Sequence, residues 1–253
     1  MKNTLAAILF FLSWSLLSSQ NNYTFSHQAI IRGDSSLKRL AIIFSGDEYG
    51  EGLSFIGKTL KKERVKASFF FTGRFYRNKS FIPGIKKLIR DGHYLGPHSD
   101  MHLLYCDWVN RDSLLVTKKE FNQDLDNNYN AIDLLGISSG QTKYFLPPYE
   151  WYNESIASWT RERGIQLINF TPGTLSHTDY TTSKDKNYRS NETIYNSIIH
   201  YEQTHSNGLN GFILLMHIGA GPDRKEKFYE RLPQIIRYLK EKGYGFVTID
   251  QLI

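Results

Sequence analysis

The chain has 253 residues, a formal net charge of +6 at pH 7 and a single cysteine, Cys106. One cysteine excludes an intramolecular disulfide, and a chain of this length buries a core large enough to fold without one. We expect Cys106 to be a packed thiol. The basic residues are spread through predicted helices such as 58–66 and 225–242, which is typical of solvated helix faces and not of a nucleic-acid-binding stripe. We therefore expect no nucleic-acid partner.

The first twenty residues have the layout of a secretory signal peptide. Lys2 gives a positive start, and the apolar run from Leu5 to Leu17 is broken only by Ser13 and Ser15 before polar residues follow. The run is too short to span a bilayer, and the alternative of a buried N-terminal helix lacks a polar face. We expect an exported protein, periplasmic or extracellular, with no stable membrane insertion.

From residue 40 onward, short apolar runs alternate with amphipathic stretches. The runs predict strands over residues 40–44, 67–72, 93–96, 143–146, 166–170, 212–216 and 245–249. The amphipathic stretches predict helices over residues 53–63, 81–91, 118–135, 154–163, 192–205 and 225–242. This alternation predicts parallel βαβ units, either closed into a barrel or left as an open sheet.

The chain carries no repeat, no linker and no low-complexity tract, which favours one domain. We divide it into a signal peptide over 1–20, an N-terminal segment over 21–39 and a single domain over 40–253. Residues 171–191 show little periodicity and are predicted to form a long functional loop.

Polar residues follow several of the predicted strands directly. In barrels and sheets of parallel strands the chemistry lies at the carboxyl ends of the strands, so these residues are the candidates. They are Asp47 and Glu48, the pair His98 and His102, Glu150 after a Pro-Pro-Tyr turn, and His217.

His98 and His102 have the spacing that places two imidazoles on one face of a helical turn. Two neutral imidazoles and one carboxylate are a common ligand set for catalytic zinc, and they leave a position open for water or substrate. A carboxylate also follows another predicted strand, in the Asp47-Glu48 pair, so we predict a divalent metal site. Zinc is the default, and cobalt or nickel would suit the same ligands. The alternative is a hydrogen-bonded structural pair of histidines.

Several longer motifs occur in a fixed order along the chain. They are Ala41–Phe44 followed by an acidic loop, Lys66–Gly73, Gly92–His102, Phe145–Tyr149 and Leu214–His217. In this order they resemble the motifs of the polysaccharide deacetylase (NodB-homology) domain of family 4 carbohydrate esterases. The resemblance covers about residues 40–249, nearly the whole mature chain, and the ordered set is far more specific than any one motif.

The resemblance implies a distorted (β/α)7 barrel and metal-dependent hydrolysis of N- or O-linked acetyl groups on a polysaccharide or oligosaccharide. Carried over, His98 and His102 are metal ligands, and His217 is the acid that protonates the leaving amine or alcohol. The backbone N–H of Tyr149 would face the oxyanion of the tetrahedral intermediate. Tyr149 and Trp151 are the expected substrate-binding residues.

The chain departs from this family at two linked positions. Ser45 stands where the family has its catalytic base, an aspartate, and Leu146 stands where the family has the arginine that pairs with that base. Their joint loss is physically coherent, because an arginine without its carboxylate would be an unpaired buried charge. We take Asp47 as the metal carboxylate, with Gly46 allowing the backbone to swing it into place.

Two acids are candidates to replace the missing base. One is Glu48, for which the alternative is a solvated loop acid, and the other is Glu150, for which the alternative is an acid at a helix N-terminus. Asp179 either orients His217 by accepting its second ring N–H or caps a turn. His177, in the same loop, is expected to be merely exposed.

These residues leave three functions open. The expected one is an active metal-dependent carbohydrate deacetylase. The second is a catalytically impaired family member that serves as a metal-containing carbohydrate-binding protein, which the loss at Ser45 and Leu146 supports. The third is an amidase for another exported substrate. Release of acetate from acetylated glycans separates the first from the second.

Overall fold

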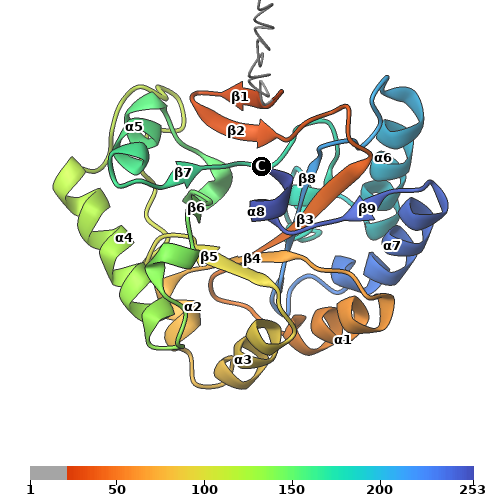
Figure 1. The fold of residues 1–253 in the computed structure, drawn as a ribbon, viewed down its shortest axis with the longest axis horizontal. Coiled ribbons are helices and arrows are strands. Elements are labelled where there is room, and N and C mark those ends of the chain that lie inside the picture. Colours follow the sequence, from red (N-terminus) through yellow and green to blue (C-terminus); the bar gives the residue numbers. More distant parts are fainter. Residues whose placement is uncertain (1–21) are drawn as a thin grey trace, which may run out of the picture.

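In the computed structural model, which describes residues 22–253, parallel strands meet at the centre of the molecule and helices surround them (Figure 1). The strands are β1 (Thr24–Ser26), β2 (Ala29–Arg32), β3 (Arg39–Gly46), β4 (Ser68–Phe71), β5 (Tyr94–Pro97), β6 (Tyr144–Phe145), β7 (Gln166–Leu167), β8 (Ile213–His217) and β9 (Gly245–Phe246). The α-helices are α1 (Leu53–Glu63), α2 (Gly73–Arg77), α3 (Ile82–Arg90), α4 (Lys118–Asp133), α5 (Glu154–Glu162), α6 (Asn191–Thr204), α7 (Leu232–Glu241) and α8 (Ile249–Leu252). The signal peptide predicted for residues 1–20 lies outside the described residues.

The central sheet has the strand order β5-β4-β3-β8, and every pair in it is parallel. Every side chain from Leu40 to Phe44 in β3 is buried, as expected for a parallel strand that is covered on both faces. The register of β3 places Ser45 beside Phe70 of β4 on one side and beside His217 of β8 on the other. The carboxyl ends of the strands therefore meet at one end of the sheet.

The barrel continues from β5 through β6 and β7 with few backbone hydrogen bonds. The amide of Leu146 donates to the carbonyl of Pro97 at 3.3 Å, which joins β6 to β5, and β6 pairs in parallel with β7. These strands are short, so the barrel is irregular on this side. The predicted α/β fold, a distorted (β/α)7 barrel, is confirmed.

The N-terminal hairpin β1–β2 occupies the space between β7 and β8 (Figure 1). Ile30 forms a parallel bridge with Ile168, just after β7, and Arg32 forms an antiparallel bridge with Phe212, just before β8. The buried guanidinium of Arg32 donates to the carbonyl oxygens of Asn210 (2.8 Å) and Gly208 (2.9 Å). Residues 24–32, which the sequence analysis places before the domain, thus contribute to the barrel.

The predicted elements from 40 to 205 agree with the structure to within a few residues, and later ones were wrong in part. The helix predicted over 225–242 begins only at Leu232, after a 3-10 turn over Phe228–Arg231, because Pro233 fits only the first turn of a helix. The strand predicted over 245–249 ends at Phe246, and α8 follows it. Within residues 22–253, no helix combines the length and apolar character needed to cross a membrane.

Gly211 holds the hairpin against the barrel and provides a test of this packing. Its φ is +65°, its carbonyl accepts the amide of Gly33 at 2.8 Å, and an added Cβ would lie 2.5 Å from the carbonyl oxygen of Gly33. We expect Gly211→Ala to lower the free energy of unfolding by more than about 2 kcal/mol, because left-handed strain and a backbone clash add together. Urea denaturation measures this loss.

Gly164→Ala is the matched control. Gly164 also has a positive φ of +72°, but a Cβ there would meet nothing within 4 Å. Only the conformational cost of about 1 kcal/mol applies there. Equal losses in the two variants would show that the hairpin contact at Gly211 contributes nothing.

Candidate active site

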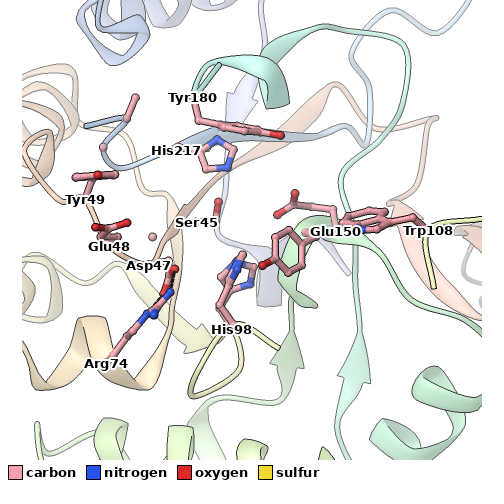
Figure 2. A pocket seen from close by; sticks show the side chains of 15 residues that line it. Ser45, Asp47, Glu48, Tyr49, Arg74, His98, Trp108, Glu150, Tyr180 and His217 are labelled. Atoms are coloured by element: carbon pink, nitrogen blue, oxygen red, sulfur yellow. Dashed lines mark hydrogen bonds and ion pairs between the residues drawn. The ribbon is translucent and has the colours of Figure 1, made fainter. Parts of the chain in front are cut away.

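The carboxyl ends of β3, β5 and β8 border a pocket with a volume of about 400 Å³ (Figure 2). Helix α2, the turn after β6 and the long loop before α6 complete its walls. The residues that line it are Ser45, Gly46, Asp47, Glu48, Tyr49, Arg74, His98, His102, Trp108, Tyr149, Glu150, Tyr180, His217, Gly219 and Ala220.

The two histidines predicted to bind a metal lie side by side in this pocket. Their ring centroids are 5.1 Å apart. They do not lie on a helical turn as predicted, because Ser99 and His102 adopt positive φ values of 70° and 56° and turn the segment into a loop. The spacing of four residues therefore brings the rings together by a different backbone path.

His98 is fixed from both its backbone and its side chain. Its amide donates to the side chain of Asn128 at 2.7 Å, and its Nδ1 lies 2.8 Å from the carbonyl oxygen of Leu146. A carbonyl only accepts, so Nδ1 carries the proton and Nε2 keeps its lone pair. Burial lowers the pKa of His98 to about 3 and the pKa of His102 to about 4, so both imidazoles are neutral, which is the form that binds metals.

Asp47, the predicted third ligand, forms a two-pronged ion pair with Arg74 of α2 (Figure 2). Burial on its own would raise the pKa of Asp47, but the hydrogen bonds and the charge of Arg74 outweigh it and hold that pKa below its usual value. In residues 22–253 no three His, Cys, Asp or Glu side chains are grouped so that they could hold a metal ion. The two imidazoles suit a divalent metal. The Asp47 carboxylate would have to leave its ion pair with Arg74 in order to bind the metal as well.

His217 and Asp179 form a close polar contact at the edge of the pocket. One oxygen of Asp179 lies 2.6 Å from Nδ1 of His217, and the other accepts the backbone N–H of His217 at 2.9 Å. Asp179 therefore makes the contact expected of a residue that orients His217. Burial would lower the pKa of His217, but the charges of Asp179 and Glu150 raise it above its usual value.

Glu150 reaches the pocket through a strained turn. Tyr149 and Glu150 have φ values of 59° and 53°, and the side chain of Asn169 donates to the carbonyl of Glu150 at 2.8 Å. Burial raises the pKa of Glu150 to about 7, against the lowering effect of His217. Helix α5 begins only at Glu154, so the alternative of a helix N-terminal acid is wrong.

The side chains of Glu150, His217 and His98 point into one space, whereas Glu48 lies apart from them beside Tyr49 (Figure 2). Glu48 is exposed, as the alternative of a solvated loop acid expects. Glu150 is thus the better placed of the two acids that were candidates for the missing base.

Aromatic rings form the rim of the pocket. The ring centroid of Tyr149 lies 4.3 Å from that of His102 and 5.5 Å from that of Trp108. Tyr180 covers His217 at 4.8 Å. Trp151, expected to bind substrate, lines an adjoining pocket instead. The motifs gave no signal for Trp108 or Arg74, because these residues lie outside the matched positions, whereas Asp179 and Tyr180 resemble the family's Asp-Trp pair.

Ser45 and Leu146 are both buried, and within residues 22–253 Ser45 Oγ has no hydrogen-bond partner. Gly46 is not the hinge that we expected. It is the last residue of β3, and an added Cβ would lie 2.6 Å from the side chain of Ile218 and 2.9 Å from Phe71. The backbone approaches both neighbours closely, so only glycine fits at this strand end.

Comparison with known proteins bears on the same residues. The family model of the polysaccharide deacetylases matches residues 37–168, a range that includes His98, His102 and Glu150. The chain belongs to the polysaccharide deacetylase family. The expectation of a carbohydrate deacetylase-type hydrolase is therefore confirmed at the level of the family.

Relatives and solved structures of this family match most of the chain. The peptidoglycan-N-acetylmuramic acid deacetylase PdaA of Bacillus subtilis is 25% identical over 234 residues, which is 92% of this chain and 78% of that protein. The peptidoglycan-N-acetylglucosamine deacetylase PgdA of Listeria monocytogenes is 28% identical over 222 residues, 85% of this chain and 39% of that protein. A family 4 carbohydrate esterase pseudoenzyme of Bacillus anthracis matches the fold with a TM-score of 0.68 at 22% identity, covering 90% of this chain and 69% of that chain.

The contact between Asp179 and His217 predicts a pH-dependent stability. Because folding raises the pKa of His217, this contact contributes stability that is fully present below a pH of about 6.5 and is lost as the pH rises through the raised value. We expect Asp179→Asn to lower the pKa of His217 by about 1 or more and to cost more stability at about pH 6 than at about pH 9.

Titration of His217 by NMR and thermal denaturation at both pH values measure these effects. Asp185→Asn is the control, since Asp185 is an exposed acid that binds only the nearby Thr182. A pKa of His217 that is the same in wild type and Asp179→Asn would contradict the orienting role.

Proposed function

We propose that this protein is a metal-dependent hydrolase that removes N- or O-linked acetyl groups from a polysaccharide or oligosaccharide. One observation supports this most directly: an oriented histidine and a half-buried acid of raised pKa share a pocket with two neutral histidines. These are the groups that hydrolysis of an amide or ester requires. The named deacetylases among the relatives act on peptidoglycan, so an acetylated glycan of this kind is the substrate class that we propose.

In this proposal Glu150 is the general base and His217 is the general acid. The Glu150 carboxylate takes a proton from water as the water oxygen attacks the acetyl carbon. His217, held by Asp179, gives its Nε2 proton to the leaving nitrogen or oxygen when that bond to the acetyl carbon breaks. The products are acetate and the free amine or alcohol.

His98, His102 and Asp47 are the proposed holders of a divalent metal. The ion, with zinc as the first choice and cobalt or nickel as alternatives, would supply Lewis acidity and lower the pKa of a bound water. His98 suits this role because Leu146 fixes its tautomer through Nδ1. Asp47 would become the third ligand once its carboxylate leaves the ion pair with Arg74.

Metal content tests this set of ligands. We expect wild-type protein reconstituted with zinc to hold about one equivalent, and His98→Ala to lose it, because a single imidazole and a carboxylate bind too weakly. Arg74→Ala should bind zinc more tightly than wild type, since Asp47 no longer has to exchange an ion pair. Mass spectrometry of the dialysed proteins measures the metal.

His200→Ala is the matched control, because His200 is an exposed histidine on α6, away from the pocket. It should retain the metal. Equal zinc in wild type and His98→Ala would disprove the proposed ligands.

Acetate release tests the assignment of the base. We expect Glu150→Gln to lower kcat by about 100-fold or more on an acetylated glycan, because no proton acceptor remains. The wild-type rate should rise with pH through about 7, where Glu150 loses its proton. The exposed acid Glu48 provides the matched control, and Glu48→Gln should change kcat by less than about twofold. The opposite ranking of these two variants would make Glu48 the base.

A carbohydrate-binding protein without turnover is the second candidate. It is favoured by the ion pair that occupies Asp47 and by the absence of the family's base and arginine at Ser45 and Leu146. Glycan binding with no acetate release at any pH, with zinc present, would establish this candidate.

We also propose that the protein is exported to the periplasm or the extracellular space. The proposal is based on the sequence of residues 1–20 alone. It agrees with a glycan substrate of the cell exterior.

A further inference from the structure

A second pocket adjoins the candidate active site and has a volume of about 320 Å³. Tyr149, Glu150 and Tyr180 line both pockets, so the two are separated only by these side chains. Trp151, Tyr152 and Phe170 add aromatic surface to the second pocket. Aromatic walls of this kind are suited to the flat apolar faces of sugar rings.

Arg111 is the cation of this second pocket, and it is held rigidly. Its guanidinium carbon lies 3.8 Å from the ring centroid of Trp151 and 5.6 Å from that of Tyr152. The side chain of Asn153 donates to the carbonyl of Arg111 at 3.0 Å and fixes the backbone. The guanidinium is therefore in place before any ligand arrives, which reduces the entropy lost on binding.

The Nη1 of Arg111 lies 3.2 Å from both ring nitrogens of His27, but its Nε is an unused donor and the described residues give the guanidinium no carboxylate partner. Arg74, Arg77 and Arg163 each form an ion pair with an aspartate, whereas among residues 22–253 Arg111 forms no ion pair. Its Nε is buried and lacks any hydrogen-bond partner in the described part of the chain. A buried N–H without an acceptor costs free energy, and a ligand oxygen would remove that cost.

His177 lines the same pocket. It is half-buried and not merely exposed as the sequence predicted, and its ring stacks on Phe170 with centroids 4.5 Å apart. Burial lowers the pKa of His177, so its neutral imidazole adds to the aromatic wall and carries no competing positive charge.

We propose that this second pocket is a subsite for the sugar next to the acetylated one, and that Arg111 selects a sugar that carries a carboxylate. This inference rests on the proposed function, because the neighbouring pocket is taken to hold the acetylated sugar. Glu150 is the only acid among the residues that line the second pocket, and its raised pKa limits the repulsion of an anionic ligand. Arginine is suited to the task because its planar fork matches the two oxygens of a carboxylate.

Calorimetric titration with two tetrasaccharides tests the proposal. One is the hyaluronan tetrasaccharide, in which N-acetylated sugars alternate with sugars bearing a carboxylate. The other is its carboxyl-reduced form, which differs only in that charge. EDTA is present throughout, so that metal-dependent turnover cannot consume the ligand. We expect wild type to bind the acidic ligand about tenfold more tightly than the reduced one.

Arg111→Gln should remove this preference and leave the affinity for the reduced ligand within about twofold. Arg90→Gln is the control, since it removes the same charge at an exposed position at the opposite end of the barrel strands. It should keep the preference. Circular dichroism shows whether each variant is folded, and Arg111→Lys provides a charge-conserving variant if Arg111→Gln unfolds.

Three results would overturn the proposal. The first is that wild type binds both ligands equally, and the second is that it binds neither. The third is that Arg111→Gln weakens the binding of both ligands equally, which would make Arg111 only a structural clamp on Trp151. A preference that depends on Arg111, together with no acetate release from acetylated glycans in a separate assay with zinc present, would leave the subsite standing and reject the hydrolase.

Discussion

The parallel pairing of β3 with β4 and β8 is the constraint on which the rest of the molecule depends. It sets Ser45 of β3 directly beside His217 of β8, and it brings the carboxyl ends of β3, β5 and β8 to one pocket. The close contacts of Gly46 with Ile218 and Phe71 leave no room for a side chain at the end of β3. Ser45, at the position of the family's base, carries no carboxylate either, so a base must come from another element.

Glu150 supplies an acid from the turn after β6. Leu146, before this turn, is buried and uncharged, and its carbonyl oxygen fixes the ring of His98. The positive φ values of Tyr149 and Glu150 are a local cost, and Asn169 offsets part of it by holding the turn. Burial then keeps the carboxyl group at a pKa near neutrality, where it can exchange a proton.

The pocket separates two kinds of charge. At one side the ion pair with Arg74 holds the pKa of Asp47 below its usual value. At the other side burial raises the pKa of Glu150 to about 7, and the charges of Asp179 and Glu150 raise the pKa of His217. Opposite environments for carboxyl groups in one pocket are the usual means by which a site assigns different roles to them. The second pocket beyond Tyr149 and Glu150 adds the unpaired charge of Arg111.

The sequence by itself determined the alternation of strands and helices, the family, and the strand ends that carry His98, His102 and His217. Apolar runs and short motifs are local patterns, and each specifies the element in which it lies. The sequence did not determine that Asp47 pairs with Arg74, that residues 24–32 fill the gap between β7 and β8, or that Glu150 and not Glu48 points toward His98 and His217. These are contacts between distant segments or consequences of a strained turn, and only the packed chain decides them, because burial and partner charge do not exist until the barrel closes.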